Sequence, residues 1–424
     1  MKPKTYAIKG DICFSTGKNE LHTFENHYLV CVDGLSAGVF ETLPEKYASL
    51  EIFDFTGQLI VPGLVDLHIH APQFTFRGLG MDDELMDWLN NHAFPEEGKY
   101  SDLEYAEKAY TEFAEKLKMS ATTRACIFAT VHVPATELLM ELMEKTGLHT
   151  YVGKVNMDRN CLDYLVESTE ESISDTESWV QNTANRFEHT KVILTPRFLP
   201  TCTDELMRAL RKIQVKYCLP LQSHISENPA EIELVKALYP KAAFYGDAYD
   251  SFGLFGKDVP TLMAHCVYSE GEELNRLKEN GVFVAHCPQS NLNLASGVAP
   301  ARSFLDMGIR CGLGTDVAGG FSESIFRAMA DAVQMSKIRW RLLDKALKPL
   351  SFEEAFYLGT KGGGEFFGRV GSFEEGYEFD TVVIDDAPPK HFSDITLKER
   401  LERYVYLSTG REIAHKFISG TQIF

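Results

Sequence analysis

Apolar and polar residues alternate in two separate parts of the chain, residues 1–62 and 371–424. In both parts, aromatic and β-branched residues alternate with polar ones in short segments bounded by turn residues, which is typical of half-buried strands. The strands expected from this pattern are Tyr6–Phe14, Tyr28–Val32, Glu51–Thr56, Thr381–Ile384, Glu402–Leu407 and Glu412–Ile418. We therefore expect the two ends of the chain to build one small β-sandwich module together.

Residues 63–370 show a different pattern, in which continuous apolar runs alternate with helix signals. Eight runs are long enough for buried strands: 65–70, 122–130, 150–158, 192–200, 219–227, 261–267, 282–291 and 310–318. Between them, Ser101 opens a capping-box pattern, Thr203 can cap a helix, and Asn228 precedes a proline and Glu231. Eight strand–helix units in series predict an α/β fold, a (β/α)8 TIM barrel with the β-sandwich module beside it.

Length and charge narrow the classes of partner. The 424 residues suffice for a barrel with an added module. The net charge of −19 disfavours binding to nucleic acid or to an anionic membrane. No apolar run approaches the roughly 18 residues of a membrane span, and no signal peptide is visible. Nine cysteines without a C-x-x-C pair fit reduced thiols, so we expect a cytoplasmic protein.

Ionisable residues gather at the predicted C-terminal ends of the barrel strands, where such barrels place their chemistry. His68 and His70 end the first strand and, two residues apart, point to the same side. The later strand ends carry Arg197, His224 with Glu227, His265, His286 and Asp316. A single buried histidine is more often a hydrogen-bonded core residue than a ligand. Together, however, these groups would be costly to bury without a partner. The set therefore predicts a metal site, and its nitrogen and oxygen donors suit zinc or iron.

The motifs around these residues, P-G-L-V-D-x-H-x-H, S-H-x-S-E, A-H-C and G-T-D, resemble the mononuclear aminohydrolase branch of the amidohydrolase superfamily. The resemblance extends over the whole chain. Four further stretches are similar to members of this branch that act on guanine: HAPQF (70–74), WLNNHAFPEE (88–97), TPRF (195–198) and GLGTDVAGGFS (312–322). The resemblance implies a zinc-dependent homodimer, with iron as the alternative metal, that hydrolyses guanine to xanthine and ammonia.

The same resemblance implies a role for each site residue. The implied metal ligands are His68, His70, His224 and Asp316. The implied substrate contacts are Gln73, Arg197, Phe198, His224 and Asp316. The implied catalytic groups are Asp316, Glu227 as a proton shuttle, and His265 beside the reactive water. Arg197 carries only hydrogen-bond donors, so it could bind the O6 acceptor of guanine and would meet the amino group of adenine donor to donor.

Three residues leave alternatives open. His286 either supports the site from behind or serves only the core. Lys154 is interpreted as structural, because related two-metal barrels carry a bridging lysine on the fourth strand, where this chain has Arg197; one ion is therefore expected. Arg124 stands where a small polar residue is expected in this branch, and an inward orientation would alter the pocket floor.

Two alternative functions follow from these observations. Because Arg124 differs from the residue expected in this branch, one alternative is a related aminohydrolase that acts on another purine, a pterin or a triazine. The other alternative is a catalytically dead barrel used as a binding module, although such proteins usually lose metal ligands and this set is complete. The sequence contains neither the H-x-E nor the P-C-x-x-C motif of the other zinc deaminase fold.

Overall fold

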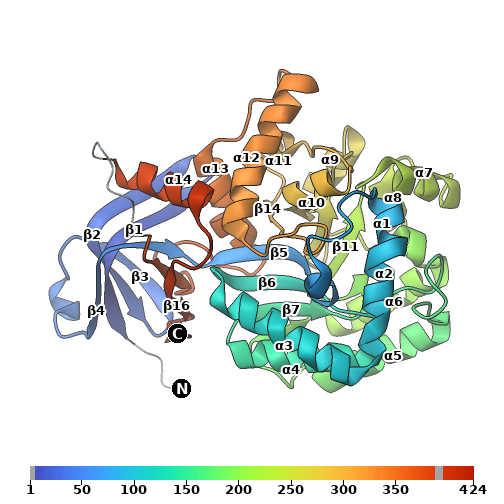
Figure 1. The fold of residues 1–424 in the computed structure, drawn as a ribbon, viewed down its shortest axis with the longest axis horizontal. Helices are drawn as coiled ribbons and strands as arrows, with labels where there is room; N and C mark the ends of the chain where they lie inside the picture. The colour runs from blue at the N-terminus through green and yellow to red at the C-terminus, as the bar shows by residue number, and fades with distance from the viewer. Residues whose placement is uncertain (1–4, 387–394) are drawn as a thin grey trace.

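The computed structural model describes residues 5–386 and 395–424, and its centre is a closed barrel of parallel strands (Figure 1). Eight strands follow one another around it: β5 (Leu64–His70), β6 (Thr122–Phe128), β7 (His149–Gly153), β9 (Thr190–Val192), β11 (Leu221–Ile225), β12 (Thr261–His265), β13 (Phe283–His286) and β14 (Cys311–Leu313). Backbone hydrogen bonds complete the ring, among them those from Leu194 N to Pro220 O (2.9 Å) and from Asp316 N to His68 O (2.8 Å). The predicted TIM barrel is confirmed.

The barrel strands are apolar runs because both of their faces are covered. Every residue of β5, β6, β11, β12, β13 and β14 is buried, as expected where side chains fill the barrel interior and helices cover the outside. The predicted third and fourth runs are each divided, because β8 (Val155–Asn156) and β10 (Thr195–Pro196) continue them as a separate pair.

At least one helix follows each barrel strand, and together the helices surround the barrel (Figure 1). They are α1 (Leu85–Trp88), α2 (Phe94–Gly98), α3 (Leu103–Met119), α4 (Val133–Thr146), α5 (Thr169–Thr183), α6 (Asp204–Tyr217), α7 (Pro229–Leu238), α8 (Tyr245–Ser251), α9 (Glu272–Glu279), α10 (Pro288–Asn293), α11 (Ala301–Met307), α12 (Ile325–Leu342) and α13 (Phe352–Tyr357). The predicted caps at Thr203 and Asn228 are present. The predicted cap at Ser101 is wrong: Asp102 caps α3 by accepting from Glu104 N (2.9 Å).

The β-module joins the two ends of the chain in one sheet beside the barrel (Figure 1). Its seven strands lie in the order β17 (Thr421–Gln422), β16 (Ile413–Ile418), β15 (Thr381–Ile384), β4 (Ile52–Pro62), β1 (Tyr6–Gly17), β2 (Glu20–Val32) and β3 (Leu35–Phe40). Instead of two separate sheets, one continuous sheet packs a core on each face. Alternation along β1 and β4 turns Cys13 and Leu59 toward the barrel, and Tyr6 and Ile8 toward a core of their own.

One expected strand of the module is a helix. The segment Glu402–Leu407 lies in α14 (Leu397–Leu407), so the strand prediction is wrong there. A capping box formed by Thr396 and Glu399 starts this helix. Its buried residues have the spacing i, i+4, i+7 and i+8, which places them on one face of a helix: Leu397, Leu401, Tyr404 and Val405.

A buried network of charged groups joins the N-terminal end of the barrel to the β-module. Arg124, near the start of β6, donates to both carboxylate oxygens of Asp380 (2.6 and 3.0 Å). Its Nη1 lies 2.5 Å from His149 Nδ1. Lys416 Nζ donates to the carbonyl oxygens of Thr122 (2.8 Å) and Leu117 (3.3 Å). Arg124 therefore points toward the module and takes no part in the pocket at the other end.

Among the described helices, none combines the length and the apolar character needed to cross a bilayer. No disulfide joins any of the nine cysteines, all of which lie in the described part of the chain.

Candidate active site

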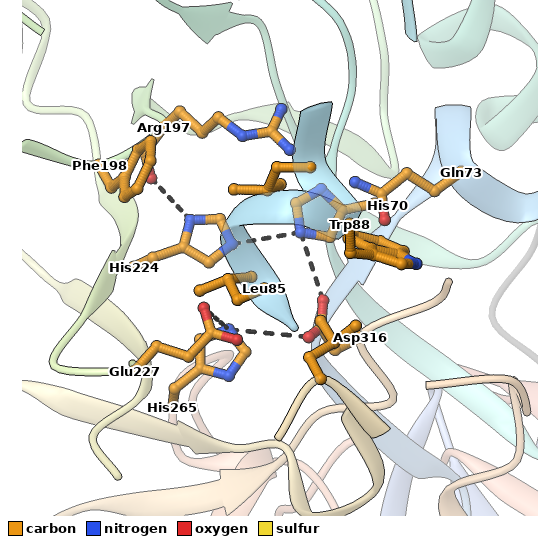
Figure 2. Close-up of a pocket in the computed structure, with 12 residues that line it drawn as sticks. His70, Gln73, Leu85, Trp88, Arg197, Phe198, His224, Glu227, His265 and Asp316 are labelled. Atoms are coloured by element: carbon orange, nitrogen blue, oxygen red, sulfur yellow. Dashed lines mark hydrogen bonds and ion pairs between the residues drawn. The ribbon is translucent and has the colours of Figure 1, made fainter. Parts of the chain in front are cut away.

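Polar side chains from several strand ends point into one cavity at the C-terminal end of the barrel (Figure 2). About 370 Å³ of space lies between the protein atoms here, including the part that is open to solvent. Eight of the residues singled out in the sequence line it: His70, Gln73, Arg197, Phe198, His224, Glu227, His265 and Asp316. The parallel strands bring these residues together, because their C-terminal ends meet at the same rim.

Three imidazoles and one carboxylate converge at the floor of the cavity. His70 Nε2 lies 3.2 Å from His68 Nε2 and 3.3 Å from His224 Nε2. Asp316 Oδ1 lies 3.1 Å from His68 Nε2 and 3.4 Å from His70 Nε2. The structure therefore groups the four side chains that the resemblance implies as metal ligands.

The protonation of these groups fits a cation at their centre. Burial lowers the pKa of His68, His70 and His224, which favours the neutral imidazoles that metal binding requires. His224 Nδ1 lies 2.6 Å from the carbonyl oxygen of Arg197, so Nδ1 carries the proton and Nε2 keeps its lone pair. The Nε2 lone pair of His224 faces His70 Nε2 at 3.3 Å, where it is available to a cation.

Asp316 supplies the negative charge of this group. Burial acts to raise its pKa, but the interactions with His68 outweigh this effect. The pKa of Asp316 therefore falls below its ordinary value. The carboxylate therefore stays ionised at neutral pH. Asp66, two residues before His68 in β5, ties this strand to the segment after β14. It accepts from Thr315 N (3.0 Å), Thr315 Oγ1 (2.6 Å) and His68 N (3.1 Å). Burial raises the pKa of Asp66 to about 7.

Glu227 lies beside this group and is buried with it. Its Oε2 is 3.4 Å from His265 Nε2, and its Oε1 accepts from Ser296 Oγ at 3.4 Å. Burial, with the charges of Asp316 and Glu231, raises the pKa of Glu227 well above its ordinary value. The carboxyl group of Glu231 also accepts from Glu227 N (3.0 Å), which anchors the backbone at this position.

His265 is oriented by a residue that the sequence analysis did not select. Its Nδ1 lies 2.8 Å from Asn291 Oδ1, so Nδ1 donates and Nε2 is directed to the site. His265 Nε2 lies 3.4 Å from Glu227 and 3.7 Å from Asp316 Oδ2. Asn291 ends the stretch HCPQSN (286–291). Its polar side chain at the end of the predicted strand 282–291 was the one feature of the sequence that could have indicated this role.

The opposite wall of the cavity carries residues that can contact a planar ligand. Gln73 accepts from Ala318 N (3.0 Å), and both Gln73 Nε2 and Arg197 Nη1 donate to the carboxylate of Glu97. Phe198 packs edge-on to His224, with ring centroids 6.4 Å apart. Four apolar residues complete the lining, and their side chains gave no chemical signal in the sequence: Leu85, Trp88, Leu89 and Leu294.

Two residues whose roles the sequence left open, Lys154 and His286, do not line the cavity. Lys154 is fully buried and donates to Glu167 Oε1 (2.5 Å) and to the carbonyl of Val155 (3.1 Å). His286 ends β13, and its Nδ1 has no hydrogen-bond partner among the described residues. Burial lowers the pKa of His286 to about 4, so the imidazole is neutral.

Comparisons with known proteins agree with this geometry. Residues 59–423 match the amidohydrolase family. Guanine deaminases of Dictyostelium discoideum and Rattus norvegicus are 38% and 40% identical to this chain, over 88% and 86% of its length and 84% and 83% of their own. A crystal structure of the guanine deaminase from C. acetobutylicum, with guanine bound in its active site, is 46% identical with a TM-score of 0.96, covering 99% of this chain and all of that one. The chain therefore belongs to the amidohydrolase family, in which these relatives are guanine deaminases.

Proposed function

We propose that this chain hydrolyses guanine to xanthine and ammonia in the cavity at the C-terminal end of the barrel. One observation carries the proposal: four ligand-type side chains converge beside the buried Glu227, opposite an arginine and a glutamine that can contact a purine edge. The guanine deaminases to which the chain is similar, one of them with bound guanine, support the same substrate.

One divalent ion would be held by His68, His70, His224 and Asp316, whose nitrogen and oxygen donors suit zinc, with iron as the alternative. Such an ion supplies Lewis acidity that lowers the pKa of a water molecule to about 7. The neutral histidines and the ionised Asp316 have the protonation states that this role needs.

The side chains of the site account for the proton transfers. Asp316 accepts the first proton of the attacking water. Glu227, protonated because its pKa is raised, donates to ring nitrogen N3 and makes C2 more electrophilic. When the water oxygen has bonded to C2, its second proton returns to Glu227, and the proton on Asp316 passes to the amino group. The C2–N bond then breaks, ammonia leaves, and the C2=O bond of xanthine forms.

His265 acts on the water that attacks. With Nδ1 donating to Asn291, Nε2 can accept a hydrogen bond from that water and fix its direction. The same nitrogen lies near both Glu227 and Asp316, which transfer protons to and from the water and the substrate.

Recognition of the base follows from donors and acceptors. Arg197 offers only donors and is buried, so it suits the O6 acceptor of guanine. Against an amino group at that position, a buried donor without a partner costs about 1–3 kcal/mol. Phe198 offers an aromatic face for packing on the purine.

The assembly proposed from the resemblance is a cytoplasmic homodimer. Light scattering of the purified protein would test whether it is a dimer.

Ammonia release from guanine by protein of defined metal content tests the function. We expect turnover in the metal-loaded protein, loss after chelation, and recovery with zinc or iron. A panel with adenine, cytosine and a pterin is the control for specificity. Equal turnover of these compounds would assign the site to another aminohydrolase reaction, and a protein that never binds metal would support the binding-module alternative.

A further inference from the structure

Glu97 connects the two residues proposed to contact the purine edge. Its Oε1 accepts from Gln73 Nε2 (2.8 Å), and its Oε2 accepts from Arg197 Nη1 (2.5 Å). The side chain is 1% exposed and lies in α2, at the end of the stretch WLNNHAFPEE. None of the roles described above uses this residue.

The contacts of Gln73 determine which way its amide points. Its Oε1 accepts from the backbone N–H of Ala318, which can only donate, and its Nε2 donates to the Glu97 carboxylate, which can only accept. A flipped amide would place donor against donor on one side and acceptor against acceptor on the other. Because Glu97 uses one amide hydrogen, the other hydrogen of Gln73 is left for a ligand, while the oxygen already accepts one hydrogen bond.

Arg197 is held by the same short helix. Glu97 binds one guanidinium nitrogen, and the guanidinium carbon lies 5.0 Å from the ring centroid of Phe94, also in α2. The contact with Glu97 balances the positive charge of a side chain that is 3% exposed. The other N–H groups of the guanidinium stay available on the cavity side, which Arg197 lines.

We propose that Glu97 is a positioning residue that determines substrate specificity. It sets Gln73 and Arg197 so that this wall presents N–H donors to the substrate, and it cancels the charge of Arg197. The wall then selects a neutral purine whose facing edge carries acceptors, such as O6 and N7 of guanine. This inference rests on the proposed function, because it concerns recognition of that substrate.

The variant Glu97→Gln tests the inference, because an amide has one acceptor and cannot serve both Gln73 and Arg197. We expect KM for guanine to rise roughly 10- to 100-fold, since one buried donor loses its partner, while kcat and metal content change little. The preference for guanine over 2,6-diaminopurine should narrow in parallel. That probe keeps the reacting 2-amino group and replaces O6 with a donor.

Glu96→Gln is the matched control. Glu96 is the preceding residue of the same helix, is also buried, and accepts from Thr75 (2.6 Å) and Lys99 (2.6 Å) outside the cavity lining. The chemical change is identical, so we expect stability to respond while KM for guanine and the preference over 2,6-diaminopurine stay at their wild-type values.

The double variant Gln73→Glu with Glu97→Gln separates positioning from packing. It restores an acceptor for Ala318 N–H and for Arg197, gives the amide at position 97 a carboxylate to donate to, and keeps the net charge. It also converts the ligand-facing group at position 73 from donor to acceptor. We expect stability to return to wild type while KM for guanine stays raised.

Recovery of wild-type KM in this double variant would overturn the inference, because Glu97 would then only satisfy buried partners. Unchanged KM and selectivity in Glu97→Gln would overturn it too, provided that the wild type deaminates guanine. If Glu97→Gln does not fold, the double variant carries the decision. A wild-type protein that releases no ammonia from guanine would instead refute the proposed function.

Discussion

The two ends of the barrel both bury charged side chains, and they satisfy them in opposite ways. At the N-terminal end, Arg124 makes two hydrogen bonds to Asp380, and Lys416 donates to two carbonyl oxygens. At the C-terminal end, His265 Nε2 is buried without a hydrogen-bond partner among the described residues, and the Nε2 atoms of His68, His70 and His224 face one another. Unsatisfied buried polar atoms cost free energy. The N-terminal end therefore stabilises the contact with the β-module, while the C-terminal end keeps atoms available for a ligand.

The comparison shows why burial of charge alone does not identify an active site. In the sequence, Arg124 and Arg197 look alike, since both interrupt apolar runs that become barrel strands. They differ in which end of the strand they occupy and in what faces them. Arg124 meets groups of the β-module, and Arg197 lines the cavity.

The largest effect is expected from Glu227→Gln at the C-terminal end. The amide keeps the shape of the side chain but cannot exchange protons, so kcat should fall about 10²- to 10⁴-fold. Metal content, measured by elemental analysis, should match the wild type. Loss of the metal in this variant would instead make Glu227 a ligand.

Arg124→Met tests the N-terminal end. Removing the guanidinium leaves the buried Asp380 carboxylate without its charged partner, which should destabilise the fold by about 3–5 kcal/mol. Urea unfolding measures this loss, and KM for guanine should stay unchanged in the folded protein. Glu378→Gln is the control: this partner lies 3.7 Å from Arg124 with a side chain 38% exposed, so about 0–1 kcal/mol is expected. A raised KM in Arg124→Met would mean that the two ends are coupled.

Arg197→Ala addresses recognition separately from metal binding. The side chain is removed while the backbone carbonyl that holds His224 remains. We expect KM for guanine to rise roughly 10- to 100-fold because a charged donor to the purine is lost. Steady-state kinetics and metal analysis of the same preparation measure both properties, and wild-type guanine kinetics would exclude Arg197 from recognition.

The smallest effect concerns the pH dependence of stability at the N-terminal end. Burial and the charge of Arg124 lower the pKa of His149 from 6.5 to about 4, with Asp380, His189 and Glu144 also acting on it. Between these two pH values the unfolded chain binds a proton that the folded chain does not. Stability should therefore fall by roughly 1–2 kcal/mol as the pH decreases from 6.5 to 4. In His149→Gln, unfolding midpoints should depend less on pH over this range; an identical dependence would contradict the assignment.

The ionisable residues of the site could be predicted from the sequence because a parallel barrel brings the C-terminal ends of its strands to one rim. Once eight apolar runs indicated the barrel, His68, His70, His224, His265 and Asp316 had to lie close together. Glu97 could not be found this way. It lies on a helix between two strands, and nothing local distinguishes it from Glu96, which has the same side chain and faces Thr75 and Lys99.

Secondary structure shows the same limit in the segment Glu402–Leu407. Its alternating residues predicted a strand, but the capping box at Thr396 and the packing of Leu401 and Tyr404 favour a helix. Short segments satisfy both periods, so tertiary contacts decide between them.

Periodic patterns and residue types at strand ends were enough to predict the barrel, the family resemblance and the residues that carry the chemistry. How these residues are used depends on the folded arrangement. The direction of Arg124, the amide orientation of Gln73 and the tautomer of His224 each depend on a partner that is distant in the chain: Asp380, Ala318 with Glu97, and the carbonyl of Arg197. Hydrogen bonding between distant residues is set by the folded geometry, and no local pattern encodes it.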